Sequence, residues 1–348
     1  MLSDRSIIDK ISSNPGNTIC VTHRRDFDGL ASAAFVIHYN KIPLNNIMFS
    51  DHNKADMSRA LRAMKNMHLK NGVAIFADLP LNVGIENTVK SIIKTLQDSR
   101  NTVIWLDHHR LSSSGEKLIK KCDIAVYGEN KRKCAAELVY AHLVTDKSDR
   151  YGKELARMAH VSDFYLGDKR YLETLINFGH AITYINYNDN TMERNLRRLV
   201  GCISNNDYKN RFVMINDNRY KKEARINKDK LRKNVETHMI GSIRIGIGSG
   251  MHIMDNEACR NIIMDEFSCD VAVFINVNGS KLNMRSRDGI DCYQLAKSLG
   301  GGGHMQAAGA AIKGVNLKTA AGIKLVRRKI LKNATTLYLN KRKRLVVS

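Results

Sequence analysis

The stretch Val103-Ile104-Trp105-Leu106-Asp107-His108-His109-Arg110 indicates both the kind of fold and the place of its functional site. Four apolar residues in a row are typical of a strand buried on both faces, as in a parallel sheet. Three ionisable residues follow at the point where this strand would end. Ligands of open parallel sheets bind at the carboxyl ends of the strands. The Asp-His-His triplet is therefore a candidate for metal binding, although a polar turn explains it more simply when it is taken alone.

Outward from this stretch, short apolar runs alternate with helical patterns. The predicted strands of this part are residues 19–22, 47–49, 73–77, 103–106 and 124–126. Strands that alternate with helices predict a parallel sheet covered on both faces. Beyond residue 127 the pattern is helical, with a basic stretch at 218–233. This stretch is either a solvated helical linker or a surface for nucleic acid. Strands are predicted again at 243–247, 271–275 and 282–285.

The composition is that of a globular protein with an unusual charge. No stretch approaches the roughly 20 apolar residues that cross a membrane, so no membrane contact is expected. Seven cysteines are scattered and never form a CxxC pair, which disfavours disulfides and zinc ribbons and favours a cytoplasmic location. The formal net charge of +22 attracts polyanions, with nucleic acid as the first candidate. A generally basic proteome would give the same charge.

Two other predicted strands end in the same kind of residue. The first runs into His23-Arg24-Arg25-Asp26-Phe27-Asp28-Gly29, and the third runs into Asp78. A further candidate, Asp163, ends a predicted helix. One Asp after a strand is usually a turn or a helix cap, but three strands of one sheet that end alike indicate a shared site. Carboxylates with a few imidazoles suit Mn²⁺ or Mg²⁺, and two such ions suit the displacement reaction at a phosphodiester.

A glycine-rich block marks the C-terminal part. Gly300 to Gly303 precede His304 and directly follow a predicted helix at 292–299. One glycine suffices to end a helix, so four indicate a close backbone approach with N–H groups free to bind an anion. A flexible hinge is the alternative. Arg285, followed by Ser286 at the end of a predicted strand, is a candidate clamp for a phosphate.

Together these motifs resemble the DHH phosphoesterase superfamily of RecJ-like exonucleases, nanoRNases and cyclic-dinucleotide phosphodiesterases. The resemblance covers nearly the whole chain. It is carried by His23 to Gly29, Asp78, Asp107-His108-His109, Asp163 and the block Gly300 to Gly309. It implies an α/β protein with an N-terminal parallel sheet flanked by helices. The implied parts are a DHH catalytic domain at 1–205, a helical linker at 206–240 and a smaller α/β DHH-associated domain for substrate at 241–348.

The resemblance also implies roles for single residues. A first metal would be held by His23, Asp26 and Asp78. A second would be held by Asp28, Asp78, His108 and Asp163. His109 would face the phosphate, and Asp107 would support the histidines. Substrate would contact Arg285, Ser286, Gly301, Gly302, Gly303 and His304. Asp26 stands three residues after His23, where relatives commonly have two or four, so His23 could instead contact substrate or a backbone carbonyl.

The implied activity is that of a two-metal phosphodiesterase with Mn²⁺, or Mg²⁺, as cofactor. A chain with only these two domains resembles nanoRNases, which cleave short single-stranded RNA or DNA, or dinucleotides, to 5′-mononucleotides. A RecJ-like exonuclease on longer single strands and a phosphodiesterase of cyclic di-AMP or linear dinucleotides are alternatives. A non-catalytic nucleic-acid-binding subunit is the alternative from another class. A homodimer is left open.

Overall fold

The computed structural model describes residues 4–51, 53–81, 84–128, 132–188, 190–251, 253 and 256–344. The chain forms two compact units, Met1–Arg219 and Tyr220–Ser348. The division falls inside helix α10 (Arg211–Asn234). The basic stretch at 218–233 lies in the same helix. The domain boundaries expected from the family resemblance, at 205 and 240, stay predictions.

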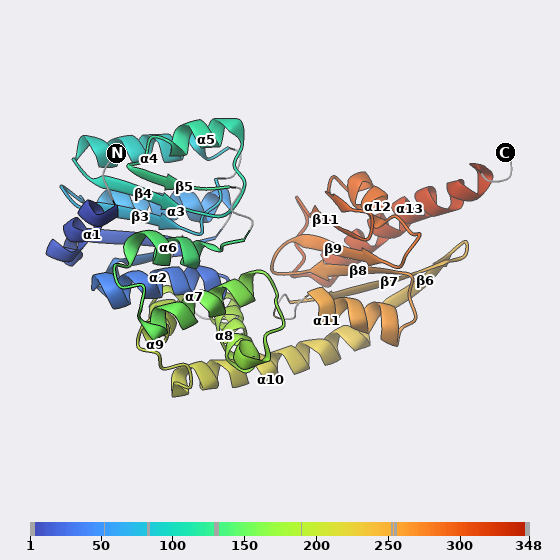
Figure 1. Cartoon of the computed structure of the whole chain (residues 1–348). Helices are drawn as coiled ribbons and strands as arrows, with labels where there is room; N and C mark the ends of the chain where they lie inside the picture. Colours follow the sequence, from blue (N-terminus) through green and yellow to red (C-terminus); the bar gives the residue numbers. More distant parts are fainter. Residues whose placement is uncertain are drawn as a thin grey trace. The chain divides into compact units, whose positions relative to one another are not determined.

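The first unit is built on a five-stranded sheet in the order β2-β1-β3-β4-β5 (Figure 1). Its strands are β1 (Thr18–His23), β2 (Ile47–Ser50), β3 (Val73–Ala77), β4 (Thr102–Leu106) and β5 (Ile124–Val126). Every pair is parallel, which confirms the predicted fold class. After β1 the chain adds β2 on one side of that strand, and it then returns to add β3 on the other side of β1. The topological switch point of the sheet therefore lies between β1 and β3.

Helices cover both faces of this sheet because its strands are apolar on both sides. Along β4, Ile104 belongs to one hydrophobic core and Trp105 to the other, where its ring stacks on Phe76 with 4.8 Å between centroids. Helices α2 and α6 pack on the first face, and α3, α4 and α5 on the second. The helices of this unit are α1 (Asp4–Ser13), α2 (Phe27–Asn40), α3 (Lys54–Asn66), α4 (Glu86–Asp98), α5 (Ser113–Ile119), α6 (Ala135–Leu143), α7 (Arg150–Asp163), α8 (Lys169–Asn188) and α9 (Met192–Ser204).

The second unit contains a six-stranded sheet in the order β10-β11-β9-β8-β7-β6. Its strands are β6 (Glu236–Ile240), β7 (Ile243–Gly250), β8 (Val271–Asn276), β9 (Lys281–Ser286), β10 (Gly302–His304) and β11 (Ala307–Ala311). Only β7 and β8 pair in parallel. The sequence patterns missed β6, β10 and β11, because these strands are polar or consist mostly of glycine and alanine and so lack the usual strand formers.

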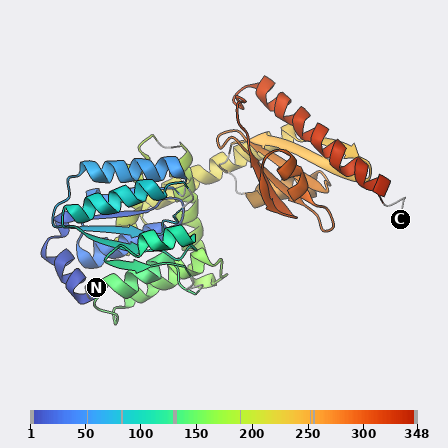
Figure 2. The same cartoon turned by 90° about the horizontal axis from the view of Figure 1, so that it is seen from above.

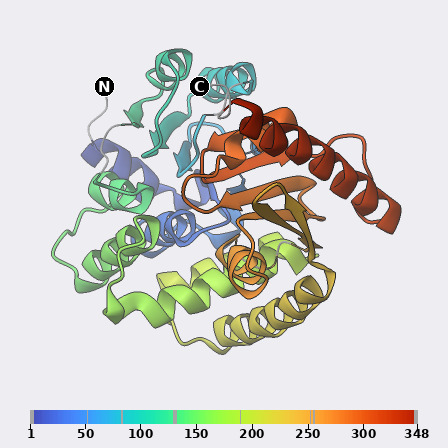
Figure 3. The same ribbon diagram turned by 90° about the vertical axis from the view of Figure 1, so that its right-hand side faces the viewer.

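Helices also cover both faces of the second sheet. The long helix α13 (Ala320–Arg344) and the short α12 (Cys292–Ser298) contribute to the core on one face (Figures 2 and 3). Helix α11 (Asn256–Arg260) continues into a π-helix, η3 (Asn261–Glu266), which contacts β7 and β8 on the other face. In the described part of the chain, no helix combines the length and apolar character that crossing a bilayer requires.

The glycine block packs tightly against a neighbouring strand. A Cβ atom on Gly301 would lie 2.0 Å from the carbonyl oxygen of Gly309, whereas a Cβ on Gly302 would meet nothing within 4 Å. We therefore expect Gly301→Ala to destabilise the protein by about 1–3 kcal/mol, the usual cost of overpacking. Gly302→Ala is the matched control and should change stability by no more than about 0.5 kcal/mol. Thermal unfolding of both variants is the measurement, and equal midpoints would contradict this account of the block.

Candidate metal centre

Acidic and imidazole side chains converge at the carboxyl edge of the first sheet, beside its switch point. His23 is the last residue of β1, Asp78 follows β3 directly, and Asp107 follows β4 directly. All of them are buried, with 4%, 2% and 0% of their surface exposed. The crevice at a switch point is where this type of sheet binds its ligands. The strand order thus gathers residues that are more than 80 positions apart in the sequence.

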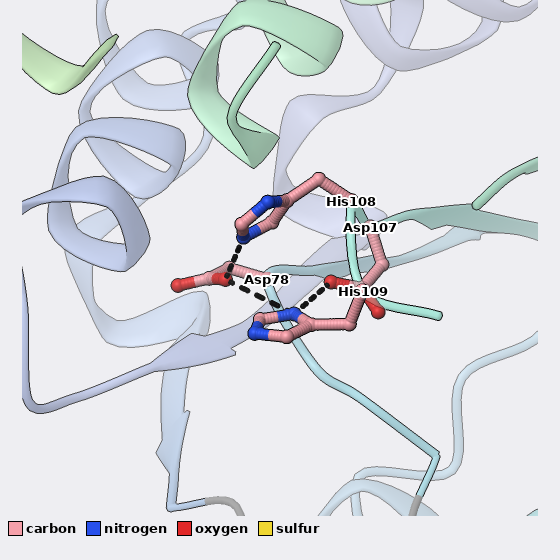
Figure 4. Close-up of side chains that lie close together, drawn as sticks. All are labelled: Asp78, Asp107, His108 and His109. Carbon is pink, nitrogen blue, oxygen red and sulfur yellow. Dashed lines mark hydrogen bonds and ion pairs between the residues drawn. The ribbon is translucent and has the colours of Figure 1, made fainter. Parts of the chain in front are cut away.

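Asp78 lies at the centre of this cluster (Figure 4). Its Oδ1 is 3.7 Å from Nε2 of His108 and 3.9 Å from Nδ1 of His109, and its Oδ2 is 3.6 Å from Nδ1 of His23. Its backbone adopts a left-handed φ of 55°. Residues other than glycine adopt this conformation rarely, and such strain persists mainly at functional sites. The strained turn after β3 therefore points to a functional role for the Asp78 carboxylate.

The side chains form three groups in which one ligand atom from each residue lies within 4.8 Å of all the others. The groups are Asp78 with Asp107, His108 and His109; His23 with Asp26 and Asp78; and Asp28 with His108 and Asp163. All six residues predicted to bind metal belong to these groups. Asp78 and His108 each belong to two of them. The assignment of each residue to a particular ion stays a prediction.

Two buried atoms of the cluster are suited to meet a cation. Among the residues that the structure describes, Oδ2 of Asp78 and Nε2 of His108 have no hydrogen-bond partner. A buried polar atom left without a partner costs free energy unless a ligand binds it. Carboxylate oxygens with a minority of imidazole nitrogens match the preferences of Mn²⁺ and Mg²⁺. The residues present therefore fit a divalent cation.

The loop after β1 is held in place by its own side chains. Asp26 caps helix α2, where its Oδ1 accepts the N–H of Gly29 at 3.0 Å, and its Oδ2 lies 2.7 Å from Nδ1 of His23. A Cβ on Gly29 would lie 2.2 Å from the carbonyl oxygen of His23, so only glycine fits there. The unusual spacing of His23 and Asp26 thus still brings both residues within reach of Asp78.

Asp28 is positioned by the start of helix α6. Its Oδ2 accepts the N–H of Ala135 and its Oδ1 accepts that of Ala136, each at 2.8 Å. Both are unsatisfied donors of the first helical turn, and the helix dipole favours a carboxylate there. Only 1% of Asp28 is exposed. Sequence patterns could not reveal this support, because more than a hundred residues separate the partners.

Asp107 and His109 form a fixed pair. Oδ1 of Asp107 lies 2.8 Å from Nδ1 of His109, and Asp107 is fully buried while a third of the His109 side chain is exposed. Because a carboxylate accepts the proton of Nδ1–H, this contact orients the ring of His109. This geometry is compatible with the supporting role predicted for Asp107 and the phosphate-facing role predicted for His109.

The predicted substrate residues of the second unit fall into two sets. Arg285 and Ser286 line a cavity of about 610 Å³, whereas the glycines and His304 are not among its lining residues. The Ser286 hydroxyl donates to the carbonyl oxygen of Ile290 at 2.6 Å, so it also holds the local turn. Residues 302–304 form the edge strand β10, on which His304 is exposed. Gln306, which lies within the block Gly300 to Gly309, also lines the cavity, as does Arg260, which no sequence pattern had indicated.

Comparisons with known proteins agree with this architecture. The DHHA1 domain model matches residues 247–332, within the second unit. A stretch of 52 residues is 46% identical to the bifunctional oligoribonuclease and PAP phosphatase NrnA of Thermus thermophilus. This match spans 14% of the chain and 16% of NrnA. Residues 247–332 of the chain therefore form a DHHA1 domain. Two solved structures of RecJ have the same fold as this chain.

The first is RecJ of Thermus thermophilus in complex with Mn²⁺, with a TM-score of 0.60 and 10% sequence identity. The alignment covers 96% of this chain and 54% of that chain, so it spans about half of the longer RecJ. The second is exonuclease RecJ bound to manganese, with a TM-score of 0.54 and 13% identity over 96% and 95% of the two chains. At these identities the likeness concerns the fold alone.

The carboxylates of the candidate metal centre crowd one another, and this alters their proton affinities. Burial raises the pKa of Asp28 well above its ordinary value, and the carboxylates of Asp78 and Asp26 raise it further. Burial alone would lower the pKa of His108, but Asp78 and Asp163 outweigh this effect and raise it to about 9. Without a cation, the cluster therefore retains protons that a cation would displace.

This proton retention predicts how the metal-free protein responds to pH. The pKa of His108 is about 9 in the folded state against an ordinary value of 6.5. Its contribution to stability is therefore complete below pH 6.5 and is lost as the pH rises to about 9. Since the ring is partly exposed, we expect wild type to lose about 1–2 kcal/mol more than His108→Asn across this window. Urea unfolding in EDTA at both ends of the window measures this difference, and equal losses would exclude the contribution.

Asp51 is a residue of this edge that the sequence patterns missed. It follows β2 directly, and its Oδ1 lies 3.7 Å from Nε2 of His23. Its carboxylate also pairs with Arg25 in the loop after β1. The signal was present, because Asp51 stands at a strand end as Asp78 and Asp107 do. It was overlooked because the second strand was predicted to end at Phe49, one residue too early.

Proposed function

We propose that this chain is a metal-dependent phosphodiesterase that hydrolyses short single-stranded oligonucleotides to 5′-mononucleotides. The observation that carries the proposal is the position of the Asp78 carboxylate, which belongs to two groups of candidate metal ligands. A carboxylate shared between two cations is suited to two-metal catalysis of phosphoryl transfer. The DHHA1 match and the stretch similar to the oligoribonuclease NrnA support a substrate made of nucleotides.

The roles proposed for the side chains follow from their positions. His23, Asp26 and Asp78 would hold one cation. Asp28, Asp78, His108 and Asp163 would hold the other. Bound Mn²⁺ or Mg²⁺ ions would supply Lewis-acid stabilisation of the charge on the phosphoryl oxygens. These ligands come from several loops and helix ends that the two cores hold rigidly, so little reorganisation is needed on binding.

His109 would act directly on the phosphate. Burial lowers its pKa, but Asp107 and Asp78 outweigh this effect and raise it, which favours the charged imidazolium. With Nδ1–H directed at Asp107, the proton on Nε2 can be donated to a phosphoryl oxygen. Such a donor stabilises charge that develops during attack on phosphorus. His109 and Asp107 would therefore contribute to catalysis without binding the cations.

The net charge of +22 favours a second candidate within the same chemistry. A strongly basic surface gains affinity with the number of phosphates it neutralises, which suits a RecJ-like exonuclease on longer single strands. Cyclic or linear dinucleotides would be the smallest substrates of such a phosphodiesterase.

A non-catalytic nucleic-acid-binding subunit would bind nucleic acid through the positive charge and would not cleave it.

Cleavage of labelled RNA and DNA of two to about thirty nucleotides, with Mn²⁺ or with EDTA, tests these proposals. Cleavage confined to strands shorter than about five nucleotides supports the oligonucleotide phosphodiesterase. Progressive shortening of the longest strands identifies the RecJ-like activity instead. Binding without metal-dependent cleavage at any length would leave the non-catalytic subunit. The polarity of cleavage follows from which end carries the label.

A further inference from the structure

An exposed aromatic side chain stands next to the candidate metal centre. Tyr165 is 94% exposed and follows Asp163 by two residues. The residue between them, Phe164, has its ring 6.4 Å from that of His108. Large aromatic side chains usually bury most of their surface, so near-complete exposure beside a functional site calls for a partner.

The backbone holds Tyr165 in this exposed position. Its φ is 50°, in the left-handed region that bulky residues avoid. The turn ends helix α7, and the N–H of Leu166 donates to the carbonyl oxygen of Val161 at 3.1 Å, as in a Schellman motif. Glycine is the usual residue at this place in the motif, because it adopts the conformation without strain. The turn itself therefore gives no reason for a tyrosine.

Other aromatic rings near the candidate ligands are already covered. The ring of Phe164 packs against His160 with 4.7 Å between centroids. The guanidinium of Arg25 lies over the ring of Tyr187, 4.9 Å from its centroid. Trp105 is fully buried in the sheet. Tyr165 thus differs from these neighbours, since its side chain is exposed to solvent.

The ligand chemistry that fits such a ring is a nucleobase. A phosphodiester at the cluster around Asp78 carries a nucleoside on either side, so a base would extend from the cluster toward its rim. A flat, uncharged ring stacks on any of the bases, because each base presents a π face. Leu166, which is 42% exposed, adds apolar surface beside Tyr165.

We propose that Tyr165 is a stacking platform for one base of the oligonucleotide whose phosphodiester is cleaved. This inference rests on the proposed function and deepens it, since it makes the base part of what the site recognises. The platform would select nucleotides over phosphate esters that lack a base, with little preference for sequence. The only preference expected is a modest one for purines, whose larger rings stack more strongly.

A binding experiment tests the platform apart from hydrolysis. The His109→Gln protein with Mn²⁺ is titrated with a dinucleotide that carries 2-aminopurine, whose fluorescence is quenched by stacking. Tyr165→Gly should bind about tenfold more weakly, with the quenching lost, and Tyr165→Phe should keep both. A dinucleotide with an abasic site in place of the stacked base should bind all of these proteins alike. Equal affinity and quenching in Tyr165→Gly would overturn the proposal.

The choice of glycine separates a role in binding from a role in folding. Tyr165→Gly removes the ring and the backbone strain together, so its melting temperature should equal or exceed that of the parent. In the otherwise wild-type protein, the same substitution should raise KM about tenfold and leave kcat unchanged, which indicates lost binding. Absence of hydrolysis in wild type would overturn the proposed function, and the fluorescence titration would then still decide the role of Tyr165.

Discussion

Asp78→Asn is expected to abolish metal-dependent cleavage, with activity lower on the order of a thousandfold or more. The carboxylate of Asp78 belongs to two groups of candidate ligands, so its loss weakens both cation sites together. Asparagine preserves the size and polarity of the side chain but removes its charge. The expected result is therefore a folded protein that binds Mn²⁺ weakly and does not turn over substrate.

Thermal unfolding with and without Mn²⁺ checks the cause of this loss. A cation at about a hundred times its dissociation constant stabilises a protein by about 2.7 kcal/mol, which raises the melting temperature by several degrees. Wild type should show this rise and Asp78→Asn should not. The control is Asp98→Asn, since Asp98 is an exposed residue at the end of α4. Full activity in Asp78→Asn would exclude the shared-ligand assignment.

His109→Gln is expected to give the second-largest effect, a fall in kcat of about a hundredfold to a thousandfold. The imidazole of His109 is oriented by Asp107 at 2.8 Å and is proposed to donate to the phosphate. Because His109 is not assigned to either cation, the stabilisation by Mn²⁺ should remain. His109→Gln should therefore lose activity but keep metal binding, whereas Asp78→Asn should lose both.

Asp107→Asn provides the matched test of how His109 is oriented. An amide oxygen accepts the Nδ1 proton more weakly than a carboxylate does, and the amide can instead turn its NH2 group toward the ring, so the orientation of the ring is no longer fixed. Loss of such a supporting partner typically costs about tenfold to a hundredfold. If His109→Gln instead lost the stabilisation by Mn²⁺, His109 would be a metal ligand and the proposed division of roles would be wrong.

Much of the first unit could be predicted from local sequence patterns. Apolar runs such as Val73–Ala77 became strands with little change, since a strand buried on both faces has few alternatives. The second unit was harder, because β10 and β11 are built from glycine, alanine and one histidine. Their strand conformation depends on the pairing of β11 with β9 and of β10 with β11, which no local pattern reveals.

The residues of the candidate site likewise fall into those that the sequence indicated and those that it did not. His23, Asp78 and Asp107 stand at strand ends and could be found from that position alone. Asp51 fits the same rule and was lost to an error of one residue in a strand boundary. Tyr165 could not be found from sequence, since its exposure and left-handed backbone depend on how helix α7 ends.

The sequence by itself determined the chemical character of this protein: the strands of the first unit, most of the carboxylates and imidazoles that end them, and the kind of cation they suit. The tertiary structure decided how these groups meet. The order β2-β1-β3-β4-β5 puts His23 and Asp78 on adjacent strands, and the start of α6 places two N–H groups on Asp28. Local patterns encode the conformation of a segment, but the partners of a side chain are set by packing between segments far apart in the chain.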